Sequence, residues 1–296
     1  MASQTVARSH PFAGIWGEVM GEFFGTMVLL LFGDGCVASL VFFGDFVSLN
    51  WMVIAWGWGI AVALGIYVAG ALSGAHINPA VTLAFAVRGK LSWSKVIPYW
   101  IAQLVGAFIA ALILYFIYQG ALVNYETTHH IVRNMFGPPN NPINAGVVWY
   151  TYNKPFVGIF GAFCDEFLGT ALLVGVLFAI IDIRNQPVQS NLAPFIIGVL
   201  IVGIGLSFGL NTGYAINPAR DFGPRLFCFF AGWGPVAIPG PNNYFWVPIV
   251  APLIGGVVGA VIYDFTIHKA LEIRGLLPSG EVAVKGEAVR QVPGED

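Results

Sequence analysis

The sequence predicts an all-α membrane protein with six transmembrane helices and two re-entrant half-helices, arranged as an inverted repeat. Three observations lead to this fold class. Of the 296 residues, 57% are hydrophobic and only 9% are charged, whereas soluble domains carry about 25% charged residues. Six apolar segments reach the roughly 20 residues that a spanning helix needs. Three motifs of the first half of the chain also recur in the second half.

The apolar segments divide into long and short ones. The six candidate spans cover residues 15–43, 51–71, 93–119, 157–182, 192–209 and 244–268. Two further apolar stretches, 78–87 and 217–228, are too short to cross a bilayer, which makes them candidates for re-entrant segments.

The distribution of Lys and Arg predicts the orientation in the membrane. With the N-terminus inside, nine Lys and Arg residues fall in inner loops and tails, and only Arg133 and Lys154 fall in outer loops. This asymmetry satisfies the positive-inside rule. We therefore expect a multi-pass protein of the cell membrane, plasma or inner, with both termini in the cytoplasm. The net charge of -2 and the lack of a basic cluster exclude a nucleic-acid partner.

The two halves of the chain share motifs in the same order. Residues 22–26, 74–80 and 102–107 recur as residues 166–170, 213–219 and 251–256. Three spans per copy is an odd number, so the second copy is expected to be inverted, and the two short segments to enter from opposite faces. The predicted units are a first repeat (1–120), an outer connecting loop (121–156), a second repeat (157–268) and a disordered cytoplasmic tail (269–296).

Each short segment begins with an Asn-Pro-Ala motif, at Asn78-Pro79-Ala80 and Asn217-Pro218-Ala219. Asn is a favoured N-cap and Pro a favoured first helical residue, so a single copy would indicate an ordinary helix start. Two copies at matching repeat positions favour a pore instead. Two N-termini meeting at the midplane would disfavour cations, and both Asn amides could donate to a solute. The acceptors would be backbone carbonyls of the preceding loops, from Gly74, Ala75, His76, Ile77, Gly213, Tyr214, Ala215 and Ile216.

A constriction is predicted on the outer side of these motifs. Arg220 follows Asn217 by three residues, and a cation inside a membrane segment is by default functional. The alternative is a buried structural ion pair with Asp221 or another acid. Trp58, Gly205 and Tyr214 are expected at a similar depth, which makes a four-residue filter plausible.

The chain up to about residue 268 resembles the major intrinsic protein (aquaporin) family, and specifically its aquaglyceroporin or glycerol facilitator branch. The resemblance is carried by residues 73–82, 128–133, 213–224 and 231–234. It implies an aquaporin-like fold with one pore per subunit and a homotetramer in the lipid bilayer. The implied function is a passive channel for glycerol and similar small neutral polyols that also passes water and excludes protons and ions. It implies no enzymatic activity, no cofactor and no metal.

The same resemblance supports the four predicted filter positions and the assignment to the glycerol facilitator branch. The family's aromatic–arginine filter maps by spacing onto Trp58, Gly205, Tyr214 and Arg220, with Trp56 a competitor for the first position. Water-selective members usually carry a His at the position of Gly205, and Asp221 is typical of glycerol facilitators. A water-selective aquaporin is the alternative function.

Several other polar residues lie in or near the apolar segments. Glu22 and Glu166 occupy equivalent repeat positions, and we expect them to brace the loops before the half-helices, with a proton relay as the alternative. His76 is expected to orient its loop rather than to titrate as a gate, and His129-His130 to pack in a loop rather than to bind metal. Asp34 could face the outer vestibule or pair with a polar group between subunits, and the sequence does not decide between them.

Rival functions lack the residues that they would need. An ion-coupled transporter needs ionisable residues or cation sites at the midplane, where this chain has asparagines and carbonyls. An intramembrane enzyme needs a catalytic dyad, and neither Asp34 nor Ser73 with His76 has a partner motif. An adhesive protein would not need an arginine in a filter.

Overall fold

The computed structural model describes residues 10–44, 50–136 and 144–275. All regular structure in these ranges is helical. The helices are α2 (Ile15–Phe43), α3 (Trp51–Ser73), α4 (Pro79–Val87), α5 (Trp93–Thr128), α6 (Ile159–Ile181), α7 (Ala193–Ser207), α8 (Gly209–Thr212), α9 (Pro218–Cys228), α10 (Val247–Tyr263) and α11 (Lys269–Ile273). Short helical turns lie at Pro11–Ala13, Ala145–Val148, Phe229–Trp233, Gly234–Val236, Pro241–Trp246 and Asp264–His268.

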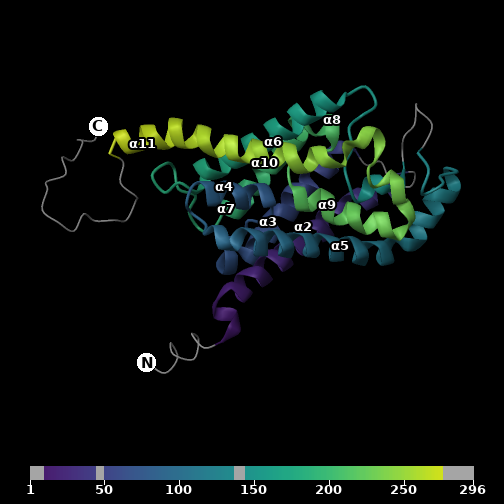
Figure 1. Cartoon of the computed structure of the whole chain (residues 1–296), viewed down its shortest axis with the longest axis horizontal. Coiled ribbons are helices and arrows are strands. Elements are labelled where there is room, and N and C mark those ends of the chain that lie inside the picture. The colour runs from purple at the N-terminus through teal and green to yellow at the C-terminus, as the bar shows by residue number, and fades with distance from the viewer. Residues whose placement is uncertain (1–9, 45–49, 137–143, 276–296) are drawn as a thin grey trace, which may run out of the picture.

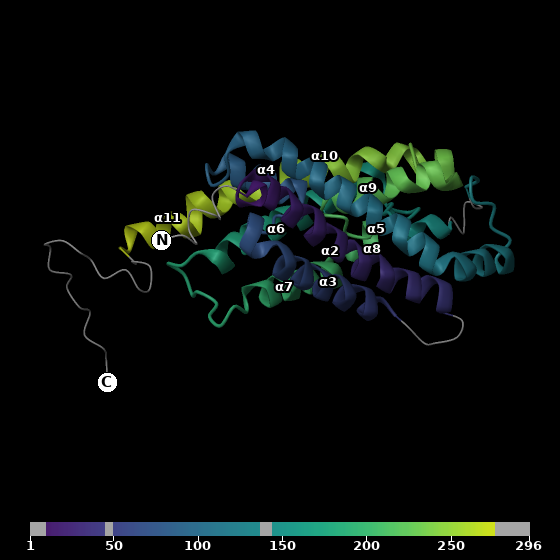
Figure 2. The same cartoon turned by 90° about the horizontal axis from the view of Figure 1, so that it is seen from below.

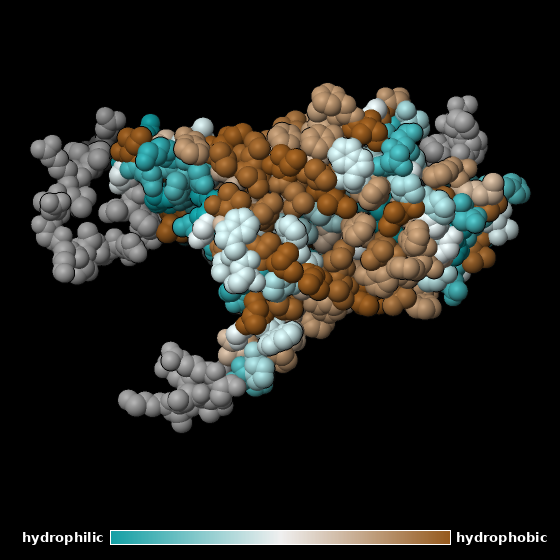
Figure 3. Space-filling view, in the orientation of Figure 1, coloured by the Kyte–Doolittle hydropathy of each residue, from teal (hydrophilic) through white to brown (hydrophobic). Residues whose placement is uncertain are grey.

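The long helices lie side by side along one axis of the molecule (Figures 1 and 2). Five helical segments among the described residues are long and apolar enough to cross a membrane. The fifth predicted span, α7, is apolar but has only 15 residues, or about 22 Å at 1.5 Å per residue. The chain breaks at Phe208 and continues as α8. Hydrophobic residues form a broad band between two hydrophilic ends (Figure 3), as a bilayer-spanning protein requires.

The largest difference from the predicted spans is the length of α5, which ends at Thr128 instead of residue 119. Its last turns carry polar residues, among them Asn124 and Glu126. Glu126 accepts hydrogen bonds from the Arg133 guanidinium at 2.7 and 2.9 Å, which ties the helix end to the following loop. Hydropathy marks where a helix leaves the apolar band, and α5 remains helical beyond that point.

Close helix contacts are equivalent in the two halves. Gly106 of α5 lies against the Phe23 carbonyl of α2, and Gly255 of α10 lies against the Phe167 carbonyl of α6. At either glycine a Cβ atom would overlap the carbonyl oxygen, so the backbones approach as closely as small residues allow. The α2–α5 pair and the α6–α10 pair are thus repeat equivalents, as the motifs predicted.

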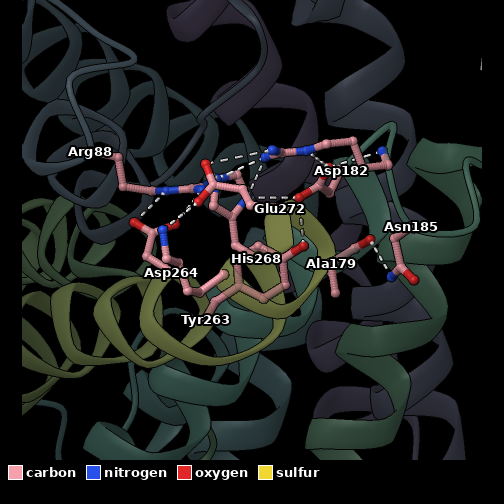
Figure 4. Close-up of polar contacts among 10 residues, drawn as sticks. Arg88, Ala179, Asp182, Asn185, Tyr263, Asp264, His268 and Glu272 are labelled. Carbon is pink, nitrogen blue, oxygen red and sulfur yellow. Dashed lines mark hydrogen bonds and ion pairs between the residues drawn. The ribbon is translucent and has the colours of Figure 1, made fainter. Parts of the chain in front are cut away.

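A cluster of charged side chains joins the ends of several helices (Figure 4). Arg88, which follows α4, forms an ion pair with Asp264 after α10. Asp182, which follows α6, accepts hydrogen bonds from the Arg184 amide at 3.0 Å and from His268 at 2.9 Å. This cluster holds the ends of α4, α6 and α10 together.

The carboxyl group of Asp182 makes this cluster sensitive to acid. Burial alone would raise the pKa of Asp182, but hydrogen bonds from His268, the Arg184 amide and Tyr263 outweigh it and hold the pKa well below its usual value. A carboxyl whose pKa is depressed in the folded state stabilises the fold above its unfolded pKa of about 3.9. That contribution is lost as the pH falls through the lower folded-state value.

We therefore expect Asp182→Asn to lower the melting temperature in detergent by a few degrees at pH 7. The difference from the unmodified protein should narrow as the pH falls from about 5 to about 3, because Asp182 takes up a proton in the unfolded chain there while it stays ionised in the folded protein. Melting curves of both proteins across this pH range test the expectation. A gap that is as wide at pH 3 as at pH 7 would contradict it.

Candidate functional site

The two Asn-Pro-Ala motifs lie next to each other. Asn78 caps α4, where its side-chain oxygen accepts from the Ala80 amide at 2.9 Å, and its side-chain nitrogen donates to the Ile216 carbonyl at 2.8 Å. Asn217 caps α9, and its side-chain nitrogen donates to the Ile77 carbonyl at 2.8 Å. Each asparagine therefore caps its own half-helix and binds the loop of the other repeat. Each amide group keeps one further N–H for a solute.

The loops before the two half-helices have matching, unusual backbone conformations. Ala75 and Ile77 have φ values of 52° and 44°, and Tyr214 and Ile216 have values of 40° and 43°. Positive φ is uncommon for residues other than glycine, and Ile adopts it rarely because it is β-branched. Such conformations persist only where surrounding contacts fix them.

Glu22 supplies these contacts in the first repeat. Its carboxylate accepts from the His76 and Ile77 amides at 2.8 and 2.6 Å. It also accepts from the Ser73 hydroxyl at 2.6 Å and from the Gln103 amide at 2.7 Å. With the loop N–H groups bound to a buried carboxylate, the loop carbonyls remain available to the cavity.

Glu166 has the same arrangement in the second repeat. It accepts from the Ala215 and Ile216 amides at 2.9 and 2.8 Å and from the Thr212 hydroxyl at 2.8 Å. The sequence motifs do not predict a bracing role for Ser73, and they do not include Thr212. Ser73 and Thr212 each directly precede the repeated glycine, and extending the motif comparison by one residue would have found them.

Both asparagines line one cavity together with the aromatic and arginine side chains expected in the filter. Trp58, Tyr214 and Arg220 all contribute to its wall, which is otherwise mostly apolar. The Arg220 guanidinium carbon lies 3.9 Å from the centre of the Trp58 ring. The structure therefore brings together residues that are up to 162 positions apart in the chain. Trp56, the competitor for Trp58, is exposed on the outside of the molecule.

Gly205 differs from the other three residues predicted for the filter because it is not part of the cavity wall. The ring of Tyr214 covers it, and a Cβ atom at Gly205 would lie 2.7 Å from that ring. The Gly205 carbonyl accepts from the Trp51 indole at 2.9 Å. Gly205 thus makes the space that the Tyr214 ring fills.

Arg220 lines the cavity and also forms a buried ion pair. A functional role in the cavity and a structural ion pair, the two interpretations of this residue, are therefore compatible. Its Nη1 atom donates to Asp34 Oδ1 and to the Trp149 carbonyl, both at 3.4 Å. Asp34 is fully buried inside the subunit. The expectation that Asp34 faces the outer vestibule or an interface between subunits was therefore wrong. The sequence indicates the depth of Asp34 in the membrane and leaves open the side of α2 on which it lies.

Asp221 is buried away from the cavity wall and pairs with an arginine other than Arg220. Its carboxylate accepts from Arg225 Nε at 2.7 Å and from the Thr151 amide and hydroxyl at 2.8 and 2.7 Å. These bonds fasten the segment between α5 and α6 to α9. This contact could not be predicted from the sequence, because Thr151 lies in a loop without a motif.

The histidines have different surroundings. His76 lies in the cavity wall, and its ring shares a 3.2 Å hydrogen bond with the Thr82 hydroxyl. His129 and His130 are exposed, and the His129 ring lies against Tyr125. Within residues 10–44, 50–136 and 144–275, no three His, Cys, Asp or Glu side chains are grouped as a metal site would need.

Comparisons with known proteins agree with this geometry. Residues 8–263 match the family model of the major intrinsic proteins. The chain is 44% identical over 246 residues to the glycerol uptake facilitator protein of Haemophilus influenzae, an alignment that covers 82% of this chain and 91% of the relative. It is 42% identical to aquaglyceroporin-2 of Rhizophagus irregularis, over 85% and 77% of the two chains. The X-ray structure of the aquaglyceroporin from Plasmodium falciparum superposes with a TM-score of 0.76 at 33% identity, covering 88% of this chain and all of that one.

Proposed function

Because the chain belongs to the major intrinsic protein family, we propose that it is a passive channel for glycerol and similar small neutral polyols, which also passes water. The observation that carries this proposal is the composition of the cavity wall. The Trp58 and Tyr214 rings and aliphatic side chains line most of it, and Arg220, Asn78 and Asn217 provide a few polar groups. Such a wall suits a solute with carbon–hydrogen groups along one edge and hydroxyl groups along the other.

The positions of the half-helices support exclusion of protons and other cations. Helices α4 and α9 both begin at the central asparagines, which bind each other's loops. Each helix N-terminus carries roughly half a positive charge. Two such ends beside one cavity raise the energy of a cation there, and neutral solutes are not affected.

The rival functions fit less well. An ion-coupled transporter would need ionisable residues or cation sites in the cavity. Of the described residues, His76 and Arg220 line it, and no carboxylate that could bind a cation does. The prediction that the chain is not an enzyme is confirmed by its family, whose members are channels.

Stopped-flow light scattering of proteoliposomes tests the proposed function. Vesicles that contain the protein should shrink in a glycerol gradient and then swell back far faster than protein-free vesicles, because glycerol follows through the pore. Water permeability is measured on the same vesicles in a sucrose gradient. Fast water flux without glycerol influx would identify a water-selective aquaporin and contradict the proposal.

We also propose that the protein is a homotetramer in the cell membrane with both termini in the cytoplasm. The family resemblance supports the tetramer, and the grouping of Arg88, Arg184 and Lys269 in the ion pairs that follow α4, α6 and α10 supports the orientation. The mass of the detergent-solubilised protein tests the first statement. To test the orientation, Ser92→Cys is introduced into a variant without native cysteines. Its thiol should be protected from an impermeant thiol reagent in intact cells.

A further inference from the structure

The most unusual feature of the cavity region is a buried acid directly behind the filter arginine. Asp34 of α2 is fully buried, and its Oδ1 atom lies 3.4 Å from Arg220 Nη1. Asp34 is not part of the cavity wall, whereas Arg220 is. The acid therefore contacts the arginine from the side away from the solute.

The local packing fixes this arrangement. Gly33, the neighbour of Asp34, lies against the Trp58 ring, where any Cβ atom would overlap it. The guanidinium of Arg220 stacks on the same ring at 3.9 Å. Trp58 thus lies against the guanidinium, and Asp34, the residue after Gly33 in α2, supplies the opposite charge.

The hydrogen bonds of Arg220 are unevenly distributed. Within the described parts of the chain, both acceptors of its guanidinium, Asp34 Oδ1 and the Trp149 carbonyl, lie at Nη1. The other guanidinium nitrogens remain as donors for a solute hydroxyl. Asp34 Oδ2 is buried without a hydrogen-bond partner in the same part of the structure. A buried polar atom without a partner is costly, so packing of α2 alone does not account for an acid at this position.

We propose that Asp34 is a specificity-determining positioning residue, a counter-ion that orients Arg220 and offsets its charge at the filter. Opposite charges 3.4 Å apart in a low-dielectric surrounding largely cancel each other's field at a distance. The solute then meets Arg220 mainly as a hydrogen-bond donor and less as a full positive charge. This inference rests on the proposed conduction of polyols and names a residue that tunes it.

Removing either partner of the Asp34–Arg220 pair should leave an unbalanced charge at the filter, positive in one case and negative in the other. Without Asp34, the guanidinium loses an anchor and its charge is no longer offset, so it should turn toward the solute, bind hydroxyls more strongly and slow glycerol. Without Arg220, the carboxylate of Asp34 stays beside the filter without a partner and should attract small cations. Removal of both groups should restore a neutral filter.

A double-mutant cycle tests the proposal in proteoliposomes made from the full chain. The proteins are the unmodified channel, Asp34→Asn, Arg220→Gln and the double variant, with glycerol influx and radiolabelled methylammonium uptake as readouts. We expect Asp34→Asn to slow glycerol about three- to tenfold in the presence of Arg220 and to have little effect in the Arg220→Gln background. Arg220→Gln alone should admit methylammonium at least about tenfold faster than the unmodified channel, a difference of about 1.4 kcal/mol in barrier. In the double variant, methylammonium uptake should fall most of the way back to that of the unmodified channel.

The matched control is Asp165→Asn in the Arg220→Gln background. Asp165 is another buried acid, but it binds Asn211 and Thr212 instead of Arg220. Its neutralisation should leave the methylammonium leak in place. The proposal is overturned if Asp34→Asn slows glycerol equally in both backgrounds, or if the double variant leaks as much as Arg220→Gln.

Different results would overturn the proposed function and the proposed role of Asp34. An unmodified channel that passes water and not glycerol would overturn the proposed function, while the cycle could still be measured with water flux and methylammonium. If Asp34→Asn alone fails to fold, the comparison between Arg220→Gln and the double variant still decides. A buried ion pair that is replaced on both sides by neutral groups is commonly tolerated.

Discussion

Glu166→Ala should prevent most of the protein molecules from folding and should therefore abolish conduction. The substitution leaves the Ala215 and Ile216 amides and the Thr212 hydroxyl without their buried acceptor. Each unsatisfied group costs about 1–3 kcal/mol, against a total stability that is typically about 5–15 kcal/mol. The yield of monodisperse protein in detergent and its melting temperature are the measurements.

The equivalent variant of the first repeat is expected to be milder. Gln103 lies beside Glu22, and its Oε1 atom has no partner among the described residues, so it can turn toward the loop when the carboxylate is removed. Pro252 occupies the matching motif position in the second repeat and offers no such atom. Glu22→Ala should therefore retain more folded protein than Glu166→Ala. The exposed residue Glu272 is the control, since Glu272→Ala should change little. Equal stability of Glu166→Ala and Glu272→Ala would show that the loop does not depend on its carboxylate.

Introducing histidine at Gly205 should reduce glycerol permeability by roughly tenfold or more, equivalent to about 1.4 kcal/mol, and water permeability less. Any Cβ at this position lies within 2.7 Å of the Tyr214 ring, which must then move. Because Tyr214 lines the cavity beside Arg220, its displacement changes the cross-section through which a polyol passes. Water is smaller and tolerates the narrowing better. Stopped-flow permeabilities for both solutes give the ratio.

Gly203 on the same helix provides the matched control. A Cβ atom at Gly203 meets nothing within 4 Å, so Gly203→Ala should conduct like the unmodified protein. Equal loss of water and glycerol in Gly205→His would argue that the space over Gly205 does not determine selectivity. The same conclusion would follow if the variant kept its full glycerol flux.

Features with a local cause could be predicted from the sequence. An asparagine followed by proline caps a helix through its own neighbours, so the starts of α4 and α9 are found within one residue of the predicted segments. The inverted repeat could be inferred because its motifs are repeated in order. Glu22 and Glu166 were singled out because an acid in an apolar segment needs a partner, and the structure supplies one in each loop.

Features that depend on the direction of a side chain could not be predicted. Asp34 and Arg220 are 186 residues apart, and hydropathy gives the depth of each residue but not the side of the helix on which it lies. Spacing along the chain predicts Gly205 beside Tyr214, whose ring covers it, but whether Gly205 reaches the cavity depends on the orientation of that ring. The end of α5 was misplaced because nine residues continue the helix after the hydropathy has fallen.

The crossed hydrogen bonds between the two repeats also constrain how the chain can be made. The Ile216 carbonyl that binds Asn78 is 138 residues further along the chain, and a ribosome adds about 5–20 residues per second. Asn78 is therefore synthesised about 7–28 s before the residue whose carbonyl it binds. During that interval the side-chain nitrogen of Asn78 lacks this acceptor. The centre of the pore is thus completed late in biosynthesis, and a nascent chain that stalls between the repeats would present this unmatched asparagine to membrane quality control.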